Sequence, residues 1–172
     1  TALLRLCNLA GRHAAGHVGD LSAVAQPGDF RIEVRRHDEA GAGRDEHPAE
    51  HRFIEEIGAA NFLALKGRTL VTPDSTSILP SITRLSLMQI AADLFGWPTE
   101  TRHIPLEELQ ELDAAACCGT AAVITWIREI VNGERRWEFP FDERWRQLYD
   151  KLVGIQTATE DDPFGWRHEI PI

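Results

Sequence analysis

Two segments of the chain carry residue types that could bind an anion. Residues 119–122, Gly-Thr-Ala-Ala, form a small-residue turn between apolar segments, so their backbone amides can approach an anion closely, and Thr120 adds a hydroxyl donor. Thr83 lies at the expected start of a helix, where unpaired N–H groups and the positive end of the helix dipole favour a phosphate. Each segment also has a simpler interpretation, as an ordinary tight turn and as a helix cap.

Two adjacent glutamates could supply the counter-charge for a cationic ring. Glu55 and Glu56 lie on an expected strand, so their side chains face opposite ways and one of them can point inward. A buried carboxylate that faces a pyridinium would be kept ionised by the opposite charge. A charged strand edge is the simpler interpretation of either glutamate alone.

The elements that would position these groups begin at Arg52, where the apolar residues take on regular spacing. The expected strands cover residues 53–65, 69–72, 99–104, 115–118, 122–131 and 137–139. The expected helices cover residues 83–95, 105–112 and 144–156. This pattern predicts a mixed α/β (α+β) protein.

Residues 1–50 differ in composition from the rest of the chain. They are rich in Gly, Ala and His, and their apolar spacing is poor, with breakers such as Pro27-Gly28. Residues 2–10 could form a helix, and we expect much of the remainder to be irregular or partly disordered. The sequence therefore predicts two regions, residues 1–50 and residues 51–172.

The composition disfavours several classes of partner. The formal net charge of −9 argues against nucleic acid and against an anionic membrane, and no apolar run is long enough to span a bilayer. Three cysteines do not make a disulfide framework, so we expect reduced thiols and a cytoplasmic location. Histidine pairs four residues apart have no evident third ligand, so no metal site is expected.

Four short segments follow one another in an order that suits a single fold, and they are residues 55–62 (EEIGAANF), 78–84 (ILPSITR), 118–122 (CGTAA) and 162–166 (DPFGW). Together they resemble the branched-chain amino-acid aminotransferases, a family of fold-type IV pyridoxal 5′-phosphate (PLP) enzymes. The resemblance runs from about residue 51 to the C-terminus. It implies that residues 51–172 form the C-terminal cofactor domain of such an enzyme, with β-barrel-like sheets and flanking helices. It also implies an incomplete protein, because the family's N-terminal domain has no counterpart.

The resemblance implies that Glu56 is the partner of the PLP ring nitrogen, since it stands five residues before Asn61, as in the family. A carboxylate at this nitrogen keeps the ring protonated, so that the ring can accept electrons during amino transfer.

The resemblance also assigns phosphate and substrate contacts. Ile82 and Thr83, at the helix start, and Thr120, at the bend, match family residues that hold the cofactor phosphate. The amides of Ala121 and Ala122 match groups that lie near the substrate carboxylate. Ser81 stands where the family usually has glycine.

The lysine that forms the Schiff base with PLP in this family has no counterpart at the expected position. The chain has two lysines, Lys66 in an expected turn and Lys151 on the last expected helix, and we expect both to be solvated surface residues. A faint match around Asn8 places Leu4 where the lysine should stand. No catalytic residue is assigned, and we expect little or no transaminase activity from the chain alone.

The resemblance implies that complete relatives transfer the amino group of leucine, isoleucine or valine to 2-oxoglutarate and form dimers. D-amino-acid aminotransferases and aminodeoxychorismate lyases share the fold type, but the EIGAAN and PFGW segments favour the branched-chain group. A different alternative is a non-catalytic remnant or interaction module. Such a module would form a homodimer or associate through exposed apolar surface.

Overall fold

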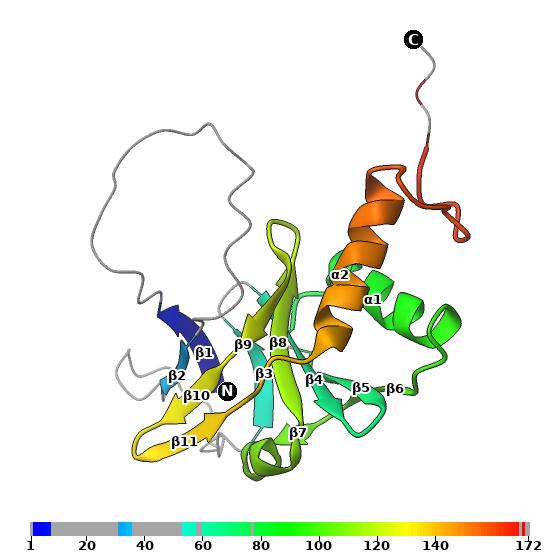
Figure 1. Ribbon diagram of the computed structural model, residues 1–172. Coiled ribbons are helices and arrows are strands. Elements are labelled where there is room, and N and C mark those ends of the chain that lie inside the picture. The colour runs from blue at the N-terminus through cyan, green and yellow to red at the C-terminus, as the bar shows by residue number, and fades with distance from the viewer. Residues whose placement is uncertain are drawn as a thin grey trace, which may run out of the picture.

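The computed structural model describes residues 2–7, 31–35, 53–57, 60–76, 78–168 and 170, with side chains from Phe53 onward except that of Glu56. The strands, labelled in Figure 1, are β1 (Ala2–Cys7), β2 (Arg31–Arg35), β3 (Phe53–Ile57), β4 (Ala60–Lys66), β5 (Thr69–Pro73), β6 (Thr99–Arg102), β7 (Ile104–Pro105), β8 (Ala114–Gly119), β9 (Val123–Ile127), β10 (Glu129–Asn132) and β11 (Arg135–Glu138). The helices are α1 (Ile82–Asp93), the 3₁₀ helix η1 (Leu106–Glu111) and α2 (Glu143–Gln156).

Strand β4 lies at the centre of the described sheet. It pairs antiparallel with β3 at its start, with β5 near its end and with β8 from Asn61 to Leu65. Strand β6 adds parallel to β5, and β9 adds antiparallel to β8. The hairpin between β4 and β5 turns at Gly67, whose φ of 59° suits a residue without a Cβ.

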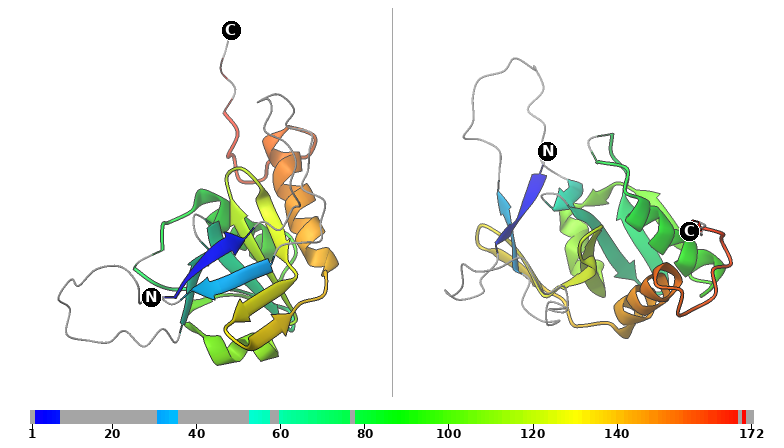
Figure 2. Two further views of the ribbon diagram at one scale, coloured as in Figure 1. Left: turned by 90° about the vertical axis from the view of Figure 1, so that its left-hand side faces the viewer. Right: turned by 90° about the horizontal axis from the view of Figure 1, so that it is seen from above.

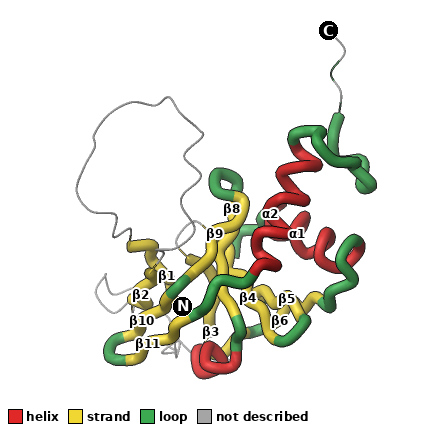
Figure 3. The backbone as a smooth tube through the Cα atoms, viewed as in Figure 1, coloured by secondary structure: helices red, strands yellow, loops and turns green. Residues whose placement is uncertain are grey.

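Two hydrophobic cores form on opposite faces of the sheet, because successive side chains of a strand alternate between its faces. Leu63 and Leu65 of β4 belong to the core that includes residues of both α1 and α2. Phe62 and Ala64 belong to the other core, which includes leucines of η1. Figure 2 shows α1 and α2 on the same side of the strands, and Figure 3 shows them beside each other.

Side-chain caps set the beginnings of both α-helices. The Ser81 hydroxyl accepts a hydrogen bond from the Arg84 N–H at 3.2 Å, and Asp142 accepts one from the Arg144 N–H at 2.9 Å. These caps satisfy N–H groups that have no partner within the helix. The predicted helices over residues 83–95 and 144–156 are confirmed; each begins one residue earlier, and α1 ends at Asp93.

The predicted mixed α/β class is confirmed, with several differences in its elements. Residues 2–7 are not helical but form β1, which pairs with β2 and β3, because strand partners distant in sequence override the helix propensity of Ala and Leu. The strands predicted over 53–65, 99–104 and 122–131 are each two strands, and the helix predicted over 105–112 is a 3₁₀ helix. The described strands do not close into a barrel.

Most of the region predicted as irregular, residues 1–50, lies outside the described residues, as do the histidine pairs and Asn8. The same holds for the side chain of Leu4. Neither α-helix in the described part of the chain is long and apolar enough to cross a membrane.

Candidate functional site

The three candidate segments meet at the start of strand β4. Asn61, which is 6% exposed, stands opposite Glu56 of β3 on one side and opposite Cys118 of β8 on the other. Cys118 leads directly into the bend that contains Thr120. The strand register therefore brings the backbone of the glutamate segment and the start of the glycine-threonine bend to the same end of the sheet.

The start of helix α1 is fastened to this end of the sheet by Asn61. The Asn61 side-chain amide donates a hydrogen bond to the carbonyl of Leu79 at 3.2 Å. Leu79 lies two residues before Ser81, the N-cap of α1. The contact therefore links the helix start to a strand that is distant in the sequence.

Two N–H groups at the start of α1 are available to a ligand. The Arg84 N–H is occupied by the Ser81 hydroxyl. The N–H groups of Ile82 and Thr83 have no hydrogen-bond partner within the described part of the chain. A helix start with free donors favours an anion through both the donors and the dipole.

Further contacts hold the loop between β5 and α1. Ser75 donates from its hydroxyl to the Glu55 carboxylate at 2.6 Å, and the Arg84 guanidinium donates to the Pro73 carbonyl at 3.4 Å. Glu55 is therefore engaged with this loop. Of Glu56 the structure describes only the backbone position, so its assignment to the ring nitrogen stays a prediction.

The bend between β8 and β9 exposes its small residues. Thr120, Ala121 and Ala122 are all exposed, and the bend closes where Gly119 pairs with Val123. Val123 has a φ of 58°, a left-handed conformation that is strained for a β-branched residue. Such strain is common at functional sites.

The positive charge of Arg84 acts on Cys118 at this end of the sheet. Its Nε atom is buried and has no hydrogen-bond partner among the described residues. Burial, together with the charge of neighbouring Cys117, raises the pKa of Cys118 to about 12, although the Arg84 charge acts to lower it. Burial also raises the pKa of Cys117 to about 11. Both thiols are therefore protonated at neutral pH and are poor nucleophiles.

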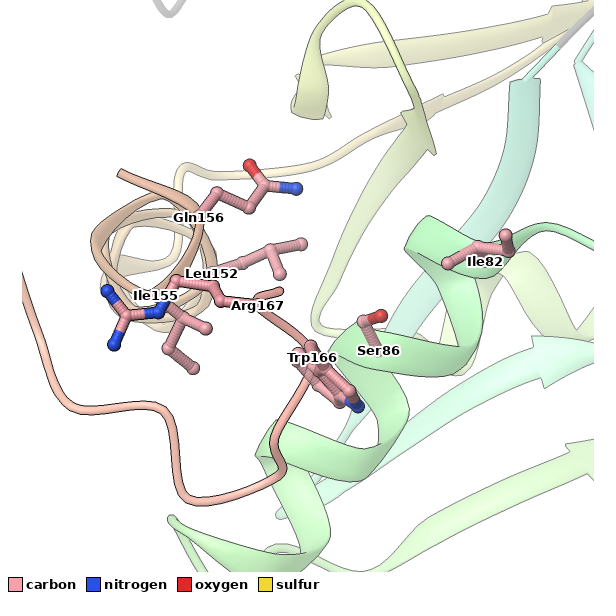
Figure 4. Close-up of a pocket in the computed structure, with 7 residues that line it drawn as sticks. All are labelled: Ile82, Ser86, Leu152, Ile155, Gln156, Trp166 and Arg167. Carbon is pink, nitrogen blue, oxygen red and sulfur yellow. The ribbon is translucent and has the colours of Figure 1, made fainter. Parts of the chain in front are cut away.

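Of the two hollows described, one reaches the start of α1 through Ile82 and the other does not. An open groove of about 420 Å³ runs between the helices and the C-terminal segment (Figure 4), lined by Ile82, Ser86, Leu152, Ile155, Gln156, Trp166 and Arg167. A second hollow of about 580 Å³ is lined by Arg128, Glu138, Phe139 and Pro140. Ile82 alone among the predicted site residues lines either hollow.

The other end of strand β4 carries an ion-pair network. Lys66 contacts Glu108 at 2.9 Å and Glu111 at 2.7 Å, and Arg102 contacts the same Glu108 at 2.6 Å and Glu100 at 2.9 Å. Hydrogen bonds from Arg102, and then from Lys66, lower the pKa of Glu108 to about 2. The two carboxylates in turn raise the pKa of Lys66.

Both lysines, predicted as solvated surface residues, are partly exposed, and each is also ion-paired. Lys66 is bound by Glu108 and Glu111, and Lys151 pairs with Glu160. Sequence reasoning could not find these pairs, since their members are between 9 and 45 residues apart. It also missed the roles of Asn61 and Arg84 as contacts between elements, although both stand inside the recognised segments.

The sheet and helices match solved fold-type IV aminotransferases. The structure superimposes on the branched-chain amino acid aminotransferase from Escherichia coli with a TM-score of 0.58 and 28% identity, over 66% of this chain and 38% of that one. The enzyme from Thermobaculum terrenum in its PLP form gives a TM-score of 0.52 and 31% identity, over 59% and 33% of the two chains. The fold class is therefore that of a fold-type IV aminotransferase.

Sequence comparison identifies the family. Residues 48–130 match the amino-transferase class IV family, and this part of the chain belongs to it. The chain is 41% identical over 125 residues to a branched-chain-amino-acid aminotransferase of Helicobacter pylori, covering 72% of this chain and 37% of that protein. It is 42% identical over 120 residues to the mitochondrial branched-chain-amino-acid aminotransferase 1 of Arabidopsis thaliana, covering 68% and 31%. The chain thus spans about a third of the length of these relatives.

Proposed function

We propose that residues 51–172 form the cofactor domain of a PLP-dependent branched-chain amino-acid aminotransferase. The observation that carries this proposal is the convergence at Asn61 of the strand of Glu56, the start of α1 and the bend at Thr120. Its substrates would be leucine, isoleucine or valine together with a 2-oxo acid, and a cytoplasmic location belongs to the same proposal.

The residues at this end of the sheet fit the phosphate of PLP. The N–H groups of Ile82 and Thr83 have no partner in the described part of the chain, and the hydroxyls of Thr83 and Thr120 are further donors. The amides of the exposed residues Ala121 and Ala122 would bind the substrate carboxylate. Bound PLP supplies an electron sink for the amino transfer, and the carboxylate of Glu56 would keep its ring nitrogen protonated.

Neither lysine is placed to bond covalently to the cofactor. Lys66 lies five residues along β4 from Asn61, about 17 Å at roughly 3.3 Å per residue, and two carboxylates hold it as an ammonium ion. Lys151 lies on α2 and is paired with Glu160. We therefore expect non-covalent cofactor binding and no appreciable transaminase activity by the chain alone.

Two measurements on the purified chain test this proposal. With PLP, leucine and 2-oxoglutarate, we expect no glutamate above background; formation at the rate of a full-length relative would overturn the proposed inactivity. After PLP addition and borohydride reduction, we expect no stoichiometric modification of Lys66 or Lys151. Modification of one lysine to one equivalent would show that the chain does supply the missing amine.

A second candidate function, association with another protein, rests on exposed apolar side chains around the start of α1. Leu79, Ile82 and Leu85 are 75%, 83% and 57% exposed. Apolar surface of this kind commonly marks an interface. Light scattering with size-exclusion chromatography tests this candidate: a homodimer that Leu85→Ser weakens supports it, and a monomer at high concentration contradicts self-association.

A further inference from the structure

We propose that Asn61 is a positioning residue that holds the start of α1 in the geometry required for phosphate binding. This inference rests on the proposed function, because it concerns how the same site is kept in shape. Asn61 itself need not touch the cofactor. Its role is to fix the carbonyl of Leu79, and through it the N–H groups of Ile82 and Thr83.

The contact of Asn61 is buried and joins distant parts of the chain. The residue is 6% exposed, and its amide donates to the Leu79 carbonyl 18 residues later, at 3.2 Å. Its backbone is held on both sides by strand pairing, opposite Glu56 and Cys118. A side chain anchored in this way provides a rigid reference point for a loop.

The Ser75 and Arg84 contacts and the buried Ile78 hold the earlier part of this loop, whereas Leu79 and Pro80 make no other hydrogen bond within the described part of the chain. The Leu79 side chain is 75% exposed, and Pro80 is exposed as well, so apolar packing contributes little there. Pro80 has no N–H and a restricted φ, so a constraint on the Leu79 carbonyl carries over to the next residue, Ser81. Ser81 is the N-cap of α1, and the position of the cap determines where the first N–H groups of the helix point.

The consequence for binding follows from the distance dependence of hydrogen bonds. Donors at a helix start and at the bend must reach the same phosphate oxygens, and charge-assisted bonds of this kind weaken sharply when a donor shifts. A misplacement of about 1 Å in a positioned site can cost on the order of a hundredfold. Loss of the Asn61 contact should therefore reduce phosphate recognition more than it reduces stability.

The test compares two ligands that differ only in the phosphate. Pyridoxamine 5′-phosphate and pyridoxamine carry no aldehyde, so neither reacts with Lys66, Lys151 or the N-terminal amine. Calorimetric titration gives the ratio of the affinity for pyridoxamine 5′-phosphate to the affinity for pyridoxamine. It is measured for wild type, Asn61→Leu and Asn61→Asp, in the cold and well below each unfolding temperature. We expect both substitutions to lower the ratio by at least about tenfold, because neither supplies the donor.

Thr72→Val is the matched control. The Thr72 hydroxyl is fully buried and also donates to a main-chain carbonyl, that of Phe62 at 3.0 Å, but among the described residues it makes no hydrogen bond to the loop before α1. We expect this variant to lose stability while it keeps the wild-type affinity ratio. A purely structural role for Asn61 would instead make Asn61→Leu and Thr72→Val indistinguishable in this ratio.

The outcomes separate the inference from the function on which it rests. If wild type does not prefer the phosphorylated ligand, the proposed function fails. If wild type prefers it and the Asn61 variants retain the preference, the positioning role is wrong. If Asn61→Leu does not fold, Asn61→Asp, which has nearly the same volume, decides the question.

Discussion

The two ends of strand β4 differ in how fully their polar groups are paired. At the Lys66 end, two cations and three carboxylates form a network in which Glu108 is shared. At the Asn61 end, the N–H groups of Ile82 and Thr83 have no partner in the described part of the chain, and Arg84 keeps a buried Nε without one.

This difference indicates a division of roles along a single strand. A saturated network stabilises the fold but offers no donor to a ligand, whereas unpaired donors contribute little to stability and are available for binding. The Lys66 end is therefore assigned to stability and the Asn61 end to recognition. Substitutions at the Lys66 end should lower stability without changing ligand affinity. Substitutions of ligand-binding groups at the Asn61 end should lower ligand affinity.

The largest expected effect is at the Lys66 end. Glu108→Gln removes a carboxylate, 12% exposed at its side chain, that two cations share, and it leaves Arg102 and Lys66 without their common partner. We expect the free energy of unfolding in urea to fall by roughly 2 kcal/mol. Affinity for pyridoxamine 5′-phosphate should not change; a loss of affinity would contradict the division of roles.

The same substitution has a defined pH dependence. The pKa of Glu108 is about 2 in the folded protein and about 4.3 for an unperturbed glutamate, so its pairs stabilise the fold fully above the higher value. That contribution is lost as the pH falls towards the folded-state value. The stability difference between wild type and Glu108→Gln should be constant above about pH 5 and should narrow towards pH 2.

At the Asn61 end, Thr83→Val and Thr120→Val should weaken binding of pyridoxamine 5′-phosphate by about tenfold each, roughly 1.4 kcal/mol, since each removes one hydroxyl donor to a charged oxygen. Their unfolding free energies should change by less than about 0.5 kcal/mol. Titration calorimetry and urea unfolding measure the two quantities. Unchanged affinity in both variants would show that these hydroxyls do not bind the phosphate.

Helix caps offer a matched pair across the two ends. Ser81 caps α1 at the candidate site, whereas Asp142 caps α2, whose Arg144 contacts the Gly67 carbonyl beside Lys66. Ser81→Ala and Asp142→Ala should each cost about 1 kcal/mol of stability. Only Ser81→Ala should also weaken binding of pyridoxamine 5′-phosphate. Equal affinities of the two variants for this ligand would argue against a role for the α1 start.

The smallest expected effect lies away from both ends. Ala158 follows α2 with a φ of 61° and is exposed, so glycine can adopt the same conformation without a Cβ penalty. Ala158→Gly should raise the unfolding free energy by about 0.5 kcal/mol and leave ligand affinity unchanged. A decrease in stability would show that the Ala158 methyl group makes a contact worth more than the strain.

Local patterns in the sequence predicted the elements that they determine and missed what depends on distant partners. The apolar spacing of α1 and α2 and the turn at Gly67 were sufficient to place these elements. A helix was predicted over residues 2–10, but residues 2–7 form a strand, because their conformation is set by pairing with β2 and β3.

The same distinction applies to the candidate site. Its segments were recognised from residue types, and the strand register that brings them together supports their assignment. The contacts of Asn61 with Leu79 and of Lys66 with Glu108 span 18 and 42 residues, so no local pattern could reveal them.

The most direct test of the account maps ligand binding residue by residue. Amide chemical shifts of the ¹⁵N-labelled chain would be followed during titration with pyridoxamine 5′-phosphate, with pyridoxamine as the control. The account predicts phosphate-dependent shifts at Ile82, Thr83 and Thr120, and none at Lys66 or Gly67. Shifts centred on Lys66 and Gly67, or none at saturating ligand, would contradict it.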